Sequence, residues 1–266
     1  MRVGALLAAV AASLALASAA TKLTVVVVEP KTGKFIPDLK ANEFSVLDDK
    51  TPRTVESVEP GSSPVDVLLL LDTSLAGPAV QPVAVDLISQ LEAKEQMAVV
   101  SVHSSADLIQ EFTSGKEILR SAIQRVRYGN FPRLLDGLYA AIDGGFDNAV
   151  YRRVAMLLTT GYEGSSRVEE KDVIRLARKS GISIVPVYIS GAERSMFEKL
   201  ARQTGGVSFN LNEMRTAGIP KPGGTIFETV RQFYTVTISG NLSLSDKLRV
   251  ELKTGQKAFV SALPQE

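Results

Sequence analysis

The sequence predicts an α/β protein with a Rossmann-like, doubly wound, mostly parallel sheet and a small β-domain formed by the two flanks. The first observation is residues 65–71 (VDVLLLL), an apolar run typical of a strand buried on both faces. The second is the alternation of strand-like and helix-like segments from residue 65 to residue 211, which indicates βαβ units. The third is that strand-like patterns lie on both sides of this block.

The first 19 residues resemble a secretory signal peptide. Arg2 is a short basic region, Val3 to Leu16 is apolar, and Ala17-Ser18-Ala19 is a small-residue cleavage signal. An uncleaved anchor helix is the alternative, but the apolar run is short for a membrane span. We therefore expect an exported protein of the periplasm, the cell envelope or the extracellular space. No later stretch reaches about 18 uninterrupted apolar residues, so we expect no membrane span after signal cleavage.

Residues 20–63 are predicted to be an amino-terminal β segment. Three runs rich in β-branched or alternating residues predict its strands, and turn residues separate them. These runs are 22–29, 44–47 and 54–58, and the sequence PGSSP at 60–64 marks the boundary with the next domain.

Residues 64–212 are predicted to be the α/β domain. Its strands are expected at 65–71, 97–102, 154–158, 182–189 and 207–211, with a short antiparallel edge strand at 108–112. Apolar residues at helical spacing predict helices at 82–91, 116–126, 134–146, 168–179 and 193–203.

The carboxyl-terminal region is predicted to begin with a linker and short helix over 213–233. The segment 234–266 then carries strand-like runs at 234–239, 248–253 and 257–262. Because two or three strands alone are marginally stable in water, we expect this segment to pair with the amino-terminal one.

Charge and residue counts exclude several function classes. The chain has 30 basic and 29 acidic residues, and loss of Arg2 with the signal peptide leaves 29 of each. This balance does not favour nucleic acid as a partner. The absence of Cys excludes disulfides and thiolate sites, and the single histidine, His103, excludes a His-rich zinc site.

The residues that follow the first strand of the α/β domain resemble a known family. Asp72-Thr73-Ser74 is similar to the start of a von Willebrand factor A (VWA) domain, which places the pattern Asp-x-Ser-x-Ser at this strand end. Four later segments resemble the same family in the same order: 97–113 (MAVVSVHSSADLIQEFT), 134–138 (LLDGL), 154–161 (VAMLLTTG) and 200–206 (LARQTGG).

The flanks resemble a narrower group. Residues 39–49 (LKANEFSVLDD) are similar to the leader of exported VWFA-related proteins common in acidobacteria. Residues 247–255 (KLRVELKTG) resemble the carboxyl-terminal strands of those proteins. The resemblance therefore covers nearly the whole mature chain.

The VWA resemblance implies a metal-ion-dependent adhesion site, in which one Asp, two Ser, a Thr and a second Asp hold Mg²⁺. Asp72 and Ser74 match, but Ala76 replaces the second Ser, Pro132 the Thr, and Thr160 the second Asp. Mg²⁺ requires an octahedral shell of oxygens, and these residues supply one carboxylate and few hydroxyls. We therefore expect a degenerate site with no metal.

Two alternatives stay open at this site. A weak Mg²⁺ site could be completed by a carboxylate from a partner, or Asp72 and Ser74 could simply cap the loop and the following helix. Arg133 could also pair with Asp72 and replace the missing cation, but a solvated surface arginine is the favoured interpretation. A hydrolase based on Ser74, His103 and Asp72 is disfavoured because no G-x-S-x-G elbow surrounds any Ser.

The hypothesis from the sequence is an exported, non-enzymatic protein-binding or scaffold module without a cofactor. Its partner is expected to be another protein. The candidate binding face comprises the loops at 72–78, 103–107, 129–134 and 160–167, with Asp72, Thr73, Ser74, Arg133 and Thr160 as site residues. The alternatives are a Mg²⁺-dependent adhesin and a self-assembling structural component of the envelope.

Overall fold

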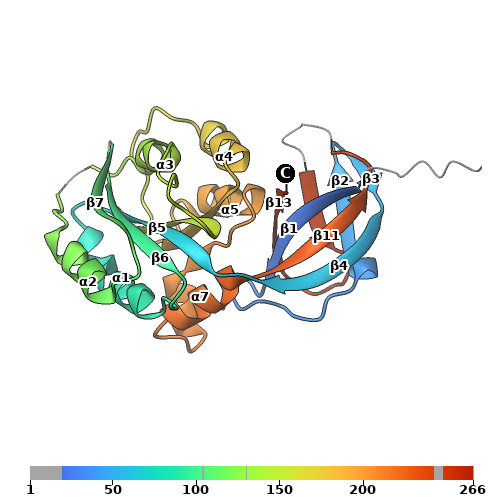
Figure 1. The fold of residues 1–266 in the computed structure, drawn as a ribbon, viewed down its shortest axis with the longest axis horizontal. Helices are drawn as coiled ribbons and strands as arrows, with labels where there is room; N and C mark the ends of the chain where they lie inside the picture. The colour runs from blue at the N-terminus through green and yellow to red at the C-terminus, as the bar shows by residue number, and fades with distance from the viewer. Residues whose placement is uncertain (1–19, 104, 130, 243–247, 266) are drawn as a thin grey trace, which may run out of the picture.

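The structure is a computed structural model that describes residues 20–103, 105–129, 131–242 and 248–265. The predicted signal peptide, residues 1–19, lies outside the described residues. The chain forms two halves that lie side by side along its longest axis (Figure 1). One half is a sheet with helices on both faces, and the other is built from strands.

The sheet of the α/β half has six strands. In sheet order these are β10 (Phe209–Asn210), β9 (Ile182–Tyr188), β8 (Arg152–Thr159), β5 (Val65–Asp72), β6 (Gln96–Val102) and β7 (Ala106–Thr113). Neighbouring strands are parallel except β7, which runs antiparallel to β6 at the edge. The first strand predicted for the α/β domain, β5, therefore lies inside the sheet between β6 and β8.

Helices cover both faces of this sheet. One face carries α1 (Gln81–Ser89), α2 (Lys116–Arg125) and α7 (Gly223–Arg231), and the other carries α3 (Leu134–Ile142), α4 (Glu170–Lys179) and α5 (Arg194–Gln203). A short turn of helix, η2 (Gly77–Val80), precedes α1, and α6 (Leu211–Thr216) follows β10.

Strand β5 contributes to both cores because its side chains alternate. Val65, Val67, Leu69 and Leu71 pack with α1, α2 and α7, whereas Leu68 and Leu70 pack with α3 and α4. All eight residues of the strand are buried. This explains why the strand shows no polar alternation and is apolar except for Asp66 and the terminal Asp72.

The β half is two packed antiparallel sheets. The larger sheet has the order β13 (Phe259–Pro264), β1 (Ala20–Val28), β11 (Gln232–Ser239) and β4 (Val55–Ser62). The smaller has β12 (Leu248–Leu252), β2 (Phe44–Asp48) and β3 (Thr51–Arg53), and the turn η1 (Ala41–Glu43) precedes β2. Strand β1 pairs with β11 and β13, so the two flanks of the chain meet in one sheet. The predicted fold class is confirmed.

Strand β1 also joins the two halves through its own side chains. Leu23, Val25 and Val27 face the smaller sheet, whereas Val26 and Val28 pack into the core of the α/β half. The larger sheet is therefore buried on both faces where the halves meet. This double burial accounts for the run of four valines in β1.

Two arginines reinforce this junction. Arg152 of β8 donates to the carbonyls of Val230 (2.7 Å) and Gly205 (3.2 Å), and burial lowers its pKa to about 10. Arg231, at the end of α7, makes a two-pronged ion pair with Glu95, whose side chain is fully buried. Burial alone would raise the pKa of Glu95, but hydrogen bonds from Arg231 and from backbone amides outweigh it, so the pKa is lowered.

The ends of several helices and strands differ from the predictions, and a glycine explains one of these differences. Helix α3 ends at Ile142 instead of residue 146, because Gly144 adopts a positive φ of 84° and turns the chain. Helix α6 overlaps the start of the segment predicted as a linker and short helix, 213–233, and its first turn is capped by the Asn210 side chain. Among the described residues, no helix is long and apolar enough to cross a membrane.

Candidate functional site

Three segments converge at the carboxyl edge of the sheet. Strand β5 ends at Asp72, strand β8 ends at Thr159, and helix α3 begins at Leu134. The parallel pairing of β5 with β8 brings the ends of these two strands together. This edge is the usual ligand site of open α/β sheets.

Asp72 is fully buried, and its carboxylate is surrounded by donors from its own chain. Oδ1 accepts a hydrogen bond from the Ser74 backbone amide at 2.9 Å. Oδ2 accepts from the Thr159 hydroxyl at 2.8 Å, the Thr160 hydroxyl at 3.1 Å and the Thr160 amide at 3.2 Å. Four hydrogen bonds therefore satisfy the charge without a counter-ion.

This geometry does not fit a divalent cation. The Thr160 hydroxyl points at Asp72 and uses a lone pair that a metal would need. Ala76 and Pro132 have no side-chain oxygen to offer. No group of three or more His, Asp or Glu side chains suited to a metal occurs in the described ranges. The available set falls short of the six oxygens that Mg²⁺ prefers.

A comparison with protein families decides the family of the chain. The von Willebrand factor type A domain family matches residues 66–220, which is more than half of the chain. The chain belongs to the von Willebrand factor type A domain family. None of the curated proteins matches the chain.

Solved structures support the same fold at low sequence identity. Proximal thread matrix protein 1 from the mussel byssus, described with a zinc-occupied MIDAS motif, is 18% identical with a TM-score of 0.54. That match covers 68% of this chain, which spans only 50% of the mussel protein. A von Willebrand factor type A protein from Catenulispora acidiphila is 11% identical with a TM-score of 0.52, covering 92% of this chain and 74% of the other.

Most of the predicted site residues of this VWA domain are buried. Thr73 is fully buried, and its hydroxyl and amide both donate to the Val102 carbonyl on β6. Ser74 and Thr160 are also buried beside Asp72. Arg133 alone among the predicted residues is partly exposed. The group therefore holds the strand ends together, and the surface above it is formed by other residues.

Arg133 does not pair with Asp72, and it is partly exposed, as the favoured sequence interpretation of a solvated surface arginine expects. The four donors to Asp72 come from Ser74, Thr159 and Thr160. Arg133 instead stands at the start of α3, beside the loop that contains Gly164. Nothing in the sequence indicated a role for the Thr159 and Thr160 hydroxyls. In the structure they donate to the Asp72 carboxylate, so Asp72 does not require Arg133 as a partner.

Glu163 is a site residue that the sequence did not indicate. Its Oε2 accepts from the backbone amides of Leu134 (2.7 Å) and Leu135 (3.3 Å), and its Oε1 bonds the Ser166 hydroxyl. It therefore caps α3 from the loop after β8. Burial raises the pKa of Glu163, and these hydrogen bonds offset only part of that effect. A carboxylate 29 residues from the helix it caps leaves no local sequence signal.

Three large apolar side chains lie exposed on the loops above Asp72. Leu75 in the loop after β5 is 84% exposed, Phe131 before α3 is 87% exposed, and Tyr162 after β8 is 55% exposed. The loops adjoin one another, since the Gly129 amide bonds the Thr73 carbonyl and Gly164 lies against the Pro132 carbonyl. Exposed aromatic and aliphatic side chains gathered in this way mark interaction surfaces.

His103 does not assemble a catalytic triad. Its Nε2 lies 2.8 Å from the carboxylate of Asp107, four residues further along the edge hairpin. Asp72, the acid that a triad would use, takes all four of its hydrogen bonds from other residues. The three residues therefore do not meet the geometric requirement for nucleophilic catalysis.

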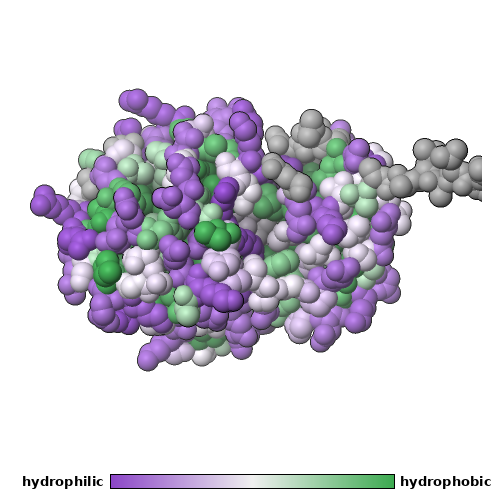
Figure 2. Space-filling model, viewed as in Figure 1, coloured by the Kyte–Doolittle hydropathy of each residue, from purple (hydrophilic) through white to green (hydrophobic). Residues whose placement is uncertain are grey.

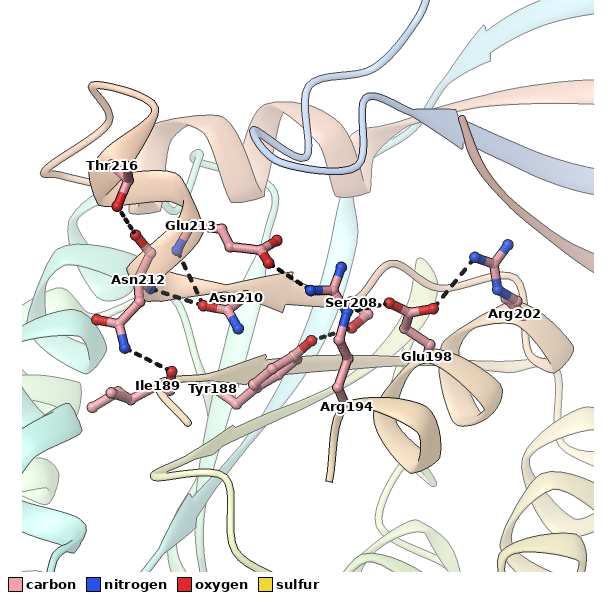
Figure 3. Close-up of polar contacts among 10 residues, drawn as sticks. All are labelled: Tyr188, Ile189, Arg194, Glu198, Arg202, Ser208, Asn210, Asn212, Glu213 and Thr216. Atoms are coloured by element: carbon pink, nitrogen blue, oxygen red, sulfur yellow. Dashed lines mark hydrogen bonds and ion pairs between the residues drawn. The ribbon is translucent and has the colours of Figure 1, made fainter. Parts of the chain in front are cut away.

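A second polar cluster lies at the carboxyl ends of β9 and β10 (Figure 3). Arg194 of α5 bonds Glu198 at 2.7 Å and also bonds Glu213 of α6, and both contacts raise its pKa. The Tyr188 and Ser208 hydroxyls lie 3.4 Å apart in the same cluster. The cavity among these residues is about 40 Å³, enough for little more than one water molecule. The cluster therefore ties α5 to α6.

Proposed function

We propose that this chain is an exported, non-enzymatic protein-binding module that uses the carboxyl-edge loops of its VWA domain without a metal ion. The observation that carries the proposal is the exposure of Leu75, Phe131 and Tyr162 on three adjoining loops. Large apolar side chains that protrude singly are common, but three around one site favour a protein partner. Phe and Tyr are also frequent in the energetic centres of protein interfaces.

Charge at this face supports the same proposal. Arg133 and Arg167 lie on these loops, and their side chains make no ion pair with the described residues. The nearby carboxylates are occupied, because Asp72, Glu163 and Asp136 each accept from the backbone. The face is therefore apolar with a positive rim. A partner with apolar side chains and a nearby carboxylate complements it.

The metal-free part of the proposal rests on Asp72. In an adhesion site the partner's acid reaches the protein through a metal, and the protein's own carboxylate holds that metal. Here the hydroxyls of Thr159 and Thr160 occupy the Asp72 oxygen that would face the ion. The mussel protein is described with zinc in the corresponding motif, and we propose that this chain differs from it in that respect.

Export is proposed from the first 19 residues and from the flanks. Residues 1–19 have the three regions of a secretory signal, and the flanking segments resemble those of exported VWFA-related proteins. The mature chain has no Cys, so it needs no disulfide chemistry after export. Detection of the mature chain in the periplasmic or secreted fraction, with an amino terminus near Ala20, tests this part.

A capture experiment tests the binding face. The purified protein serves as bait for the envelope fraction, in parallel with Leu75→Ser and Phe131→Ser variants. The matched control is Val150→Ser, because Val150 is 75% exposed but precedes β8 at the opposite edge of the sheet. We expect a partner that Val150→Ser retains and Phe131→Ser loses. A partner that binds all variants equally would place the interface elsewhere.

Metal dependence is tested separately. Calorimetric titration with Mg²⁺ or Mn²⁺ should show no saturable heat, and capture should persist in chelator. Restoring the family's oxygens with Ala76→Ser, Pro132→Thr and Thr160→Asp together should create metal binding, since it supplies the missing ligands. Micromolar Mg²⁺ binding by the natural chain that Asp72→Ala abolishes would instead establish the Mg²⁺-dependent adhesin.

The structural-component alternative predicts a different result. A self-assembling envelope protein would form oligomers through an edge strand such as β7 or β12. Light scattering of the mature chain should report a monomer if the binding-module proposal holds. Concentration-dependent assembly without a partner would favour the structural component.

A further inference from the structure

A second cavity lies far from the ion pairs of the junction, between α3 and the edge hairpin β6–β7. We name it the α3–β7 cavity, and its volume is about 330 Å³. That size falls in the range of small-molecule sites. Figure 2 shows hydrophobic side chains reaching the surface over β7, at the end of the molecule where this cavity opens.

The floor of the α3–β7 cavity is apolar and rigid. Leu68 of β5 and Ala98 and Val100 of β6 form it, and all three are otherwise buried in the core. The cavity is open because the residues that line it on the α3 side have small side chains or none. Ala140 and Ala141 line it, and the chain turns immediately afterwards through Gly144 and Gly145. A Cβ on Gly145 would lie 2.0 Å from the Ala141 carbonyl oxygen, so a larger residue cannot fill this corner.

The rim of the cavity is acidic. Glu111 of β7 and Asp143 and Asp147 after α3 line it, and their carboxylates make no hydrogen bond or ion pair with the described residues. The described lining residues include no Lys, Arg or His. The carboxyl end of α3 also points here, and its dipole adds negative potential. An apolar floor beneath unpaired negative charge does not suit an anion or a neutral polar molecule.

We propose that the α3–β7 cavity binds a small organic cation. Its apolar body lies on Leu68, Ala98 and Val100, and its ammonium or guanidinium group faces Asp143, Asp147 and Glu111. Burial of the body supplies affinity, and the charge selects cations over isosteric neutral or anionic molecules. This site is separate from the carboxyl-edge loops and does not depend on the function proposed for them.

Calorimetric titration with three six-carbon probes tests this inference. Hexylamine should bind with saturation, hexanol should bind more weakly, and hexanoate should not bind. The double variant Asp143→Asn/Asp147→Asn should weaken hexylamine binding by about tenfold, because charge-assisted hydrogen bonds are lost. The matched control is Glu56→Gln, which removes an exposed carboxylate from β4 in the other half of the molecule and should leave hexylamine binding unchanged.

A cavity-filling variant provides an independent test. Ala140 is an exposed helical position that lines the cavity, so Ala140→Leu should fold normally and abolish hexylamine binding. Its thermal unfolding curve verifies the fold. Equal binding of hexylamine and hexanoate, unchanged binding in the double variant, or no binding at millimolar probe would overturn the proposal.

The same titration distinguishes the source of the cation. A lysine residue blocked as N-acetyl and N-methylamide presents the ammonium group as a protein side chain would. If it binds as tightly as hexylamine, the cavity accepts a basic side chain of a macromolecule. If only the free amine binds, the cavity accepts a small molecule. Both results require the Asp143 and Asp147 carboxylates.

Discussion

The two ends of strand β5 each carry a buried aspartate, and both hold the neighbouring strand β8. At the amino edge, Asp66 accepts from the backbone amides of Val150 and Tyr151, which lead into β8. At the carboxyl edge, Asp72 accepts from Thr159 and Thr160, where β8 ends. The comparison shows that Asp72, which occupies the position of a metal ligand in the family pattern, makes the same kind of contact with β8 as Asp66 at the other edge.

The surroundings of the two edges differ. The amino edge adjoins the β half, where Arg152 bonds backbone carbonyls and Glu95 pairs with Arg231. The carboxyl edge adjoins solvent, and Leu75, Phe131 and Tyr162 protrude there. Charges at the amino edge therefore hold two halves of one chain together. At the carboxyl edge, the Asp72 carboxylate is satisfied locally, and apolar side chains protrude outward.

The largest effect is expected from breaking the ion pair at the amino edge. Arg231→Ala leaves the fully buried carboxylate of Glu95 without its guanidinium partner. Such a loss costs about 3–5 kcal/mol of unfolding free energy. Urea denaturation at neutral pH measures it. Arg249→Ala is the control, because Arg249 pairs with Glu251 at the surface and should change stability by less than about 1 kcal/mol.

This ion pair also predicts a pH dependence. The folded-state pKa of Glu95 is lowered from its ordinary value of 4.5, so its ionised form stabilises the folded protein. The stabilisation is complete above pH 4.5 and is lost as the pH falls through the folded-state pKa. A Glu95→Gln variant should therefore be less stable than the natural protein at neutral pH, and the difference should shrink in acid. A difference independent of pH would contradict this account.

The fold was predictable because its signals are local in the sequence. The apolar run of β5 and the helical spacing of Val173 and Ala177 in α4 reflect burial directly. The site was less predictable, because its contacts join distant residues. Thr159 and Thr160 bond an aspartate 87 and 88 positions away, and Glu163 caps a helix that begins 29 positions earlier. The lack of side-chain oxygens at Ala76 and Pro132 is visible in the sequence, but the role of the hydroxyls that bond Asp72 required the geometry.

The second prediction concerns the carboxyl edge. Asp72→Ala leaves the Thr159 and Thr160 hydroxyls and two backbone amides without their acceptor. We expect a loss of roughly 3 kcal/mol, because hydrogen bonds to a charged group are lost in a buried site. Denaturation is measured in chelator. If Asp72 served only as a metal ligand, its replacement by Ala would not lower the free energy of unfolding in chelator. The replacement would instead remove a buried, uncompensated negative charge.

The third prediction compares the aspartates directly. Asp66→Ala removes two backbone hydrogen bonds near the exposed Val150, where water can replace the lost acceptor. We expect a loss of about 1 kcal/mol, smaller than that of Asp72→Ala. The same denaturation series measures both. A larger loss at Asp66 would mean that the carboxyl edge contributes less to the fold than its four hydrogen bonds indicate.

The smallest effect is expected at Glu163, and it has the opposite dependence on pH from Glu95. Burial raises the folded-state pKa of Glu163 above its ordinary value of 4.5, so the folded protein binds this proton more tightly than the unfolded chain. The resulting stabilisation is present below pH 4.5 and is lost as the pH rises through the folded-state pKa. Glu163→Gln keeps an oxygen to accept from Leu134 and Leu135 but does not titrate. Its stability relative to the natural protein should therefore improve as the pH rises from about 4 to about 7. If the relative stability of Glu163→Gln instead declines over this range, the favourable contact of the charged carboxylate with the α3 terminus outweighs its burial.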